Sequence, residues 1–116
     1  MTRNIQVYIE DILDSITKIK QYTQSINEQE FLTNTQLQDA VLRRLEIMGE
    51  AVKSIPQAFR DRYPDIPWKK IAGLRDVLIH EYFGVNMRRA WKVAKEDIFV
   101  LRDEIKKVKK DLETQK

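Results

Sequence analysis

Apolar residues recur at alternating steps of three and four toward the end of the chain, and this spacing constrains the fold more than any other feature. They are Trp91, Ala94, Ile98, Leu101, Ile105, Val108 and Leu112. Because an α-helix completes a turn every 3.6 residues, side chains at this spacing lie on one face. The pattern predicts a long helix, capped by Asn86, whose apolar face packs along antiparallel neighbours or a partner.

Three earlier segments carry the same kind of apolar stripe. The spacing predicts helices over about 4–22, 35–55 and 67–83, with the polar stretch 23–34 as a connection. Three glycines, three prolines and 34% charged residues are typical of helices with solvated outer faces. We therefore predict one all-α domain over residues 1–116, an up-and-down bundle of four main helices plus a short helix.

Prolines and capping residues predict where these helices begin and end. Thr35 is expected to cap the second helix and Pro56 to end it, before a short amphipathic segment at 57–63. Pro67 suits the first turn of the third helix, because its missing N–H costs nothing there. Gly84 is expected to stop that helix in a left-handed conformation.

The composition excludes several classes of protein. Without cysteine the chain has no disulfide, thiolate nucleophile or cysteine zinc site. No apolar stretch is long enough to span a bilayer, and acidic residues stand where a signal peptide would have its apolar core. A soluble cytoplasmic protein is therefore expected. The net charge of +3 permits a polyanionic partner but does not require one.

The single histidine lies within residues 75–82, RDVLIHEY, which we refer to as the octet. The three serines lack the glycine-flanked turn of a serine nucleophile, so acid-base chemistry has few other places to reside. Metal catalysis is disfavoured, because one histidine and no close acidic cluster leave too few ligands. If the chain is an enzyme, Arg75 and His80 are its candidate catalytic residues.

Helical geometry separates these two candidates. At about 100° per residue, Arg75 and His80 diverge by about 140°, and His80 points away from the inward stripe of its own helix. Either the helix loosens near its end or a second copy of the chain completes the site, and a composite dimer site is the more economical prediction. Asp76, one turn before His80, could orient the imidazole or could be a solvated partner of a nearby lysine.

Such a site suits the cleavage of RNA without a metal ion. RNA carries its own nucleophile, the 2′-hydroxyl, so the protein need supply only a base, an acid and a cation for the phosphate charge. Histidine acts as acid or base near neutral pH, and arginine binds phosphate oxygens bidentately.

Gly49 and Gly73, inside predicted helices, are interpreted as points of close helix approach. At Gly73 the missing side chain could instead admit a partner backbone or an RNA strand.

The octet and its surroundings resemble the HEPN superfamily, and more closely its HepT branch. The resemblance extends over LEIMGEAVKSIP at 45–56, RYPDIPWKKIAGLRDVLIHEYFGVN at 62–86 and the following helix with Trp91. It therefore covers most of the chain. The resemblance implies an all-α bundle that forms a homodimer, with a metal-independent endoribonuclease site in the cleft between subunits and no cofactor.

The resemblance also implies a role for individual residues. Arg75 would bind and neutralise the scissile phosphate, and His80 would transfer protons. Tyr82 would accept AMP from a cognate MntA-like nucleotidyltransferase antitoxin, which silences the toxin. Helical spacing adds that Tyr82 shares a face with Arg75, so an adenylyl group on its hydroxyl would compete with RNA phosphate for the same cation.

Two alternatives stay open at this point. The chain could be a non-catalytic helical subunit that binds or regulates a nucleotidyltransferase, with the octet as docking surface and AMP acceptor. The ring of Tyr82 could also simply pack, with its hydroxyl bound to one partner. No position of the octet motif is missing, so a growth-inhibiting ribonuclease is the expected function.

Overall fold

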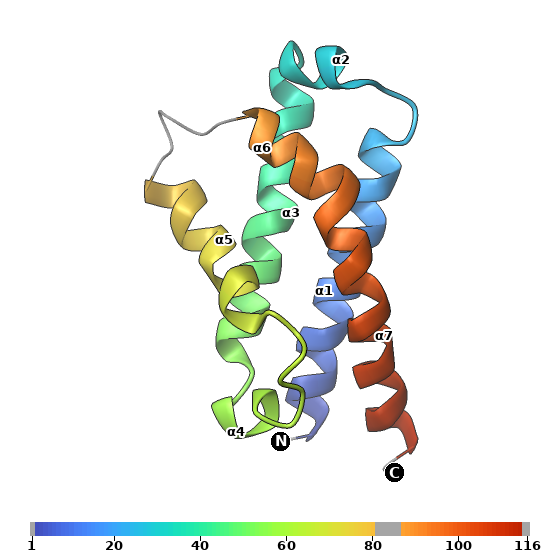
Figure 1. Ribbon diagram of the computed structural model, residues 1–116, viewed down its shortest axis with the longest axis vertical. Coiled ribbons are helices and arrows are strands. Elements are labelled where there is room, and N and C mark those ends of the chain that lie inside the picture. The colour runs from blue at the N-terminus through green and yellow to red at the C-terminus, as the bar shows by residue number, and fades with distance from the viewer. Residues whose placement is uncertain (1, 81–86, 115–116) are drawn as a thin grey trace.

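Helices form every regular element that the computed structural model describes, which confirms the predicted all-α fold. The structure describes residues 2–80 and 87–114, with the side chains of 5–74 and 87–114. Within these ranges the long helices are α1 (Thr2–Thr23), α3 (Thr35–Ser54), α5 (Trp68–His80) and α7 (Ile98–Thr114). Shorter helices are α2 (Glu28–Leu32), α4 (Gln57–Arg60) and α6 (Met87–Lys92). The long helices run alternately up and down (Figure 1).

The long helices pack as a row in the order α7, α1, α3, α5. α1 packs against both α7 and α3, whereas α5 packs against α3 at the edge of the bundle (Figure 1). The molecule measures 46 × 29 × 21 Å, so its thinnest direction holds about two helices of ~10 Å diameter. A long helix in so thin a bundle keeps part of its surface open to solvent or to a partner.

The core forms where the predicted stripes meet. Isoleucines of α1, aliphatic residues of α3 and the repeating positions of α7 are almost completely buried, as their spacing predicts. They are Ile9, Ile12, Ile16, Ile19, Val41, Leu45, Met48, Val52, Ile98, Leu101, Ile105, Val108 and Leu112. None of the helices in the described ranges combines the length and apolar character that crossing a bilayer requires.

The stretch 23–34 is not a plain connection, and that prediction was wrong. Asn27 accepts a hydrogen bond from the N–H of Glu30 (2.9 Å), and the Glu30 carboxylate accepts one from the N–H of Asn27 (3.2 Å). This capping box starts α2, which buries Phe31 against the ring of Trp91 at 5.3 Å. The cap of α3 is also one residue earlier than predicted, because Asn34 accepts from the N–H of Leu37 at 3.0 Å.

The last predicted helix is interrupted by a π-helical segment, η1 (Val93–Asp97), between α6 and α7. Its Lys95 donates a hydrogen bond to the carbonyl of Thr23 at 3.1 Å and lies 5.3 Å from the Trp91 ring centroid. A cation is favoured there because Thr23 ends α1, where unpaired carbonyls gather partial negative charge. The predicted cap Asn86 and the predicted stop Gly84 lie outside the described residues.

Gly73 is not a point of close helix approach, so that prediction was wrong. A Cβ built at Gly73 would meet nothing within 4 Å. The second interpretation, room for a partner backbone or an RNA strand beside the octet, stays a prediction.

The start of α5 is fixed by a turn that folds back on the indole of Trp68. The ring is 7% exposed, and its Nε1 donates hydrogen bonds to the carbonyls of Arg60 (3.1 Å) and Tyr63 (3.0 Å). The carbonyl of Pro67 accepts the first helical hydrogen bond from Ile71 at 3.2 Å, which agrees with the predicted start. One buried side chain therefore ties α4, the following turn and α5 together.

Trp68→Phe should lower the free energy of unfolding by about 2 kcal/mol, because two carbonyl groups lose their donor and part of the ring's space is left empty. Trp91→Phe is the matched control, since phenylalanine can keep the ring contact with Phe31. Urea unfolding of both variants measures the difference. Equal losses would show that the indole N–H of Trp68 has no special role.

Candidate functional site

The octet begins on the C-terminal half of α5. The backbone of Arg75, Asp76 and His80 is helical and continues α5 to its last described residue. Their side chains and the whole of Tyr82 lie outside the described residues, so the predicted divergence of Arg75 and His80 stays a prediction. What the structure establishes is the support beneath the octet and the surface beside it.

α3 provides that support. α5 buries Ile71, which is 3% exposed, and its partly buried Ala72 and Leu74 also pack against the core. Ile71 and Leu74 are three residues apart, so both lie on the side of α5 that faces the bundle. α5 lies at the edge of the row, where it packs against α3 (Figure 1).

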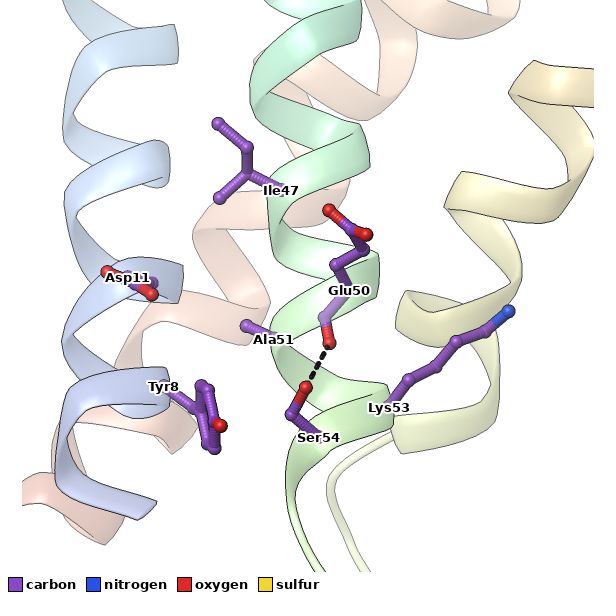
Figure 2. A pocket seen from close by; sticks show the side chains of 7 residues that line it. All are labelled: Tyr8, Asp11, Ile47, Glu50, Ala51, Lys53 and Ser54. Carbon is purple, nitrogen blue, oxygen red and sulfur yellow. Dashed lines mark hydrogen bonds between the residues drawn. The ribbon is translucent and has the colours of Figure 1, made fainter. Parts of the chain in front are cut away.

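A hollow of about 450 Å³ lies between α1 and α3, close to α5. Its lining residues come from one turn of α1 and two turns of α3 (Figure 2). They are Tyr8, Asp11, Ile47, Glu50, Ala51, Lys53 and Ser54. Glu50 and Lys53 lie on the side toward α5, and the Ser54 hydroxyl donates to the carbonyl of Glu50 at 3.2 Å (Figure 2).

The hollow lies on the face of the bundle opposite α7. Figure 1 shows α5, α3 and α1 from left to right with α7 toward the viewer, and Figure 2 shows the reverse order with α7 behind. This face mixes carboxylates and an ammonium group with the apolar Ile47 and Ala51.

Sequence reasoning missed this face. Tyr8 is half-buried: it packs against the core and also lines the hollow. Ile47, Ala51 and Ser54 follow each other at steps of four and three, which places them on one face of α3. That spacing was a readable signal for a second helix face beside the buried stripe.

Carboxylates do not gather into a metal site in the part of the chain with described side chains. No group of three histidine, cysteine, aspartate or glutamate side chains is close enough there to hold an ion. The side chains of Asp76 and His80 are not among those described, so metal independence stays a prediction.

A second contact ties the turn before α5 to α7. The hydroxyl of Tyr63 donates to a carboxylate oxygen of Asp111 at 2.9 Å. Burial, followed by this hydrogen bond and the negative charge of Asp111, raises the pKa of Tyr63 above its ordinary value of 10.0. The turn that positions α5 is therefore held at both ends, by Trp68 and by Tyr63.

The chain matches a known protein family. A family model described as "Ribonuclease HepT-like" matches residues 12–108, which include the octet. A comparison with solved structures finds no match.

Similar proteins occur in Methanocaldococcus jannaschii and Thermococcus cleftensis. One of Methanocaldococcus jannaschii, named "Putative RNase", is 44% identical over 96% of both chains. One of Thermococcus cleftensis, named "Probable ribonuclease HepT", is 46% identical over 95% of this chain and 100% of its own length. A third, from M. jannaschii and named "Gamma-glutamylcyclotransferase and putative RNase", is 46% identical over the whole of this chain. The chain spans about half of that third relative, 52% of its length.

Tyr63→Phe should lower the free energy of unfolding by about 1 kcal/mol at pH 7, since the hydrogen bond to Asp111 is lost. The raised pKa means that the folded state keeps the Tyr63 proton at a pH where the unfolded state begins to release it. This stabilisation is fully present below pH 10 and is lost as pH rises through the folded pKa. Urea unfolding between pH 7 and 11 should therefore show wild type and Tyr63→Phe converging. A constant difference would refute the coupling.

Proposed function

Because the chain belongs to the HepT-like ribonuclease family, we propose that it cleaves RNA at the octet without a metal ion. The observation that carries this proposal is the octet, complete in the sequence and inside the matched residues 12–108, whose residues 75–80 continue an edge helix. The relatives named as RNases, which align with nearly the whole chain, support it.

The proposed reaction is a transfer within the RNA strand. His80, or its copy in a second chain, takes the proton of the 2′-hydroxyl, whose oxygen forms a bond to phosphorus. The bond from phosphorus to the 5′-oxygen breaks, and an imidazolium gives that oxygen a proton. Arg75 binds the non-bridging oxygens and offsets the charge that develops on them. Asp76 would orient either residue.

We propose that two copies of the chain form the site. The five-residue spacing of Arg75 and His80 prevents one regular helix from aiming both at one atom. The face of α1, α3 and α5 opposite α7 supports this arrangement, because it holds the hollow of about 450 Å³ and borders the octet helix. Gly73 adds open space on α5, where a second helix could approach.

We further propose that Tyr82 is the off switch of this toxin. A small MntA-like nucleotidyltransferase would transfer AMP from ATP to the Tyr82 hydroxyl and release pyrophosphate. Tyr82 follows Arg75 by seven residues, so on a continuing helix the added phosphate would lie on the Arg75 face and compete with RNA.

Incubation with total RNA in excess chelator should show cleavage by wild type, with losses of at least about 100-fold for Arg75→Ala and His80→Ala. Lys92→Ala, which removes an exposed charge from α6, is the control and should keep wild-type activity. Intact RNA with wild type would overturn the proposal. Loss of transferase binding by both octet variants, without any cleavage by wild type, would instead favour a non-catalytic binding subunit.

Mixing the chain with a cognate nucleotidyltransferase and ATP should add the mass of AMP to the peptide that contains Tyr82. Tyr82→Phe should remain unmodified, while Tyr63→Phe should be modified as wild type is, because the Tyr63 hydroxyl is bound to Asp111. Mass spectrometry of the intact chain and its peptides measures both. A Tyr82→Phe chain that still gains AMP would refute the assignment.

A further inference from the structure

A second groove lies between α1 and α7, away from the octet helix. It has a volume of about 250 Å³. Its lining residues are Leu13, Ile16, Thr17, Lys20, Phe99, Arg102 and Lys106. The floor is apolar, whereas the charged lining residues are all cations, so we refer to it as the basic groove.

The cations line both walls of the basic groove. Lys20 comes from α1, and Arg102 and Lys106, one turn apart, come from α7. The acidic neighbour of Arg102 is Asp103, whose carboxylate oxygen lies 3.6 Å from its Nε. That separation is too long for a hydrogen bond, and the Arg102 Nε, although buried, has no hydrogen-bond partner. The groove therefore has an excess of positive charge and a buried N–H group without an acceptor.

Further basic residues extend the groove along α7. At about 100° per residue, Lys109 and Lys110 lie on the same side of the helix as Arg102 and Lys106. Cations thus follow one another on this side of α7 from Arg102 to Lys110, and Glu113 ends the row. A linear polymer with a negative charge at every repeat can contact such a row at several points, whereas a single small anion can contact it at one.

The basic groove and the hollow lie on different sides of α1. The α1 residues that line the groove and those that line the hollow are separated by about 160° around the helix axis. The basic groove therefore does not lie on the face that we assign to the second copy of the chain. A ligand in it would not compete with that copy.

We propose that the basic groove binds the phosphodiester backbone of RNA at a distance from the scissile bond. This rests on the proposed ribonuclease function, which supplies a polyanion as the substrate. Membrane lipid is a poorer match because the exposed large apolar residues, Val7 and Val100 among the described side chains, both lie about 130° around their helices from the groove. Long RNAs therefore bind through two sites, and very short RNAs through the octet alone.

The test measures RNA binding in a His80→Ala background, so that the probe stays intact. The probe is a fluorescein-labelled single strand of about 20 nucleotides, longer than the ~4–16 that one single-strand module commonly covers. Lys20→Gln with Lys106→Gln removes two groove cations, and Lys92→Gln with Lys107→Gln is the matched control for charge. Lys107 is 72% exposed and pairs with Glu104 at 3.5 Å, outside the groove. The side chains of all four lysines are exposed, so the variants with either pair of substitutions should fold normally.

The double substitution in the groove, the groove pair, should weaken RNA binding about tenfold. It should also make the slope of log K against log salt concentration shallower by about 1.4, which is ~0.7 for each of two lost phosphate contacts. The control pair should change the affinity by less than about twofold. With His80 intact, the groove pair should cleave a dinucleotide as wild type does and the long strand less efficiently. Equal losses of RNA affinity in the groove pair and the control pair would overturn the proposal. It would also be overturned if the groove pair bound RNA as wild type does but lost binding of polyglutamate, a polyanion without phosphates.

The same measurements separate this proposal from the ribonuclease proposal. If wild type cleaves RNA and the groove pair binds RNA with normal affinity, only the proposal that the groove binds RNA is refuted. Groove-dependent binding by a chain that cleaves no RNA would refute the ribonuclease and leave the groove as a binding site.

Discussion

The hydrogen bonds that the Trp68 indole donates to the carbonyls of Arg60 and Tyr63 are the constraint on which the candidate site depends most. The octet helix α5 lies at the edge of the bundle, where it packs against α3 and where Trp68 joins its first turn to α4. The turn that carries these carbonyls is in turn joined to α7 by the bond from Tyr63 to Asp111. A contact about two helical turns before the octet therefore helps to set the position of the backbone at Arg75 and His80.

This arrangement leaves two surfaces for two tasks. The face with the hollow, made by α1 and α3 and bordered by α5, is the surface on which we place a second copy of the chain. The basic groove between α1 and α7 is the surface on which we place RNA backbone beyond the scissile bond. α1 separates them because it packs against both α3 and α7. With both proposals, a thin bundle would have separate surfaces for a second copy of the chain and for a long substrate.

Periodicity predicted the parts of the fold that repeat over several turns. The stripes of α1, α3 and α7 were readable because a buried face recurs every three or four residues. The short helix α2 was missed, since it spans little more than one turn and depends on a capping box and on Phe31 meeting Trp91. Gly73 was misread because a helical glycine does not reveal from sequence whether a neighbour or open space lies beside it. The octet was found by elimination of other chemistry, whereas the basic groove joins Lys20 to Arg102 and Lys106, which only the packing of α1 on α7 brings together.

The central claim is that Arg75 of one chain works with His80 of another. Mixing Arg75→Ala and His80→Ala chains after partial unfolding and refolding allows mixed dimers to form, and native mass spectrometry can count them. Each mixed dimer keeps one Arg75 and one His80, on different chains. If two chains share the site, the mixture should cleave RNA measurably faster than either variant alone. A mixture that contains mixed dimers yet stays as inactive as its parents would contradict it.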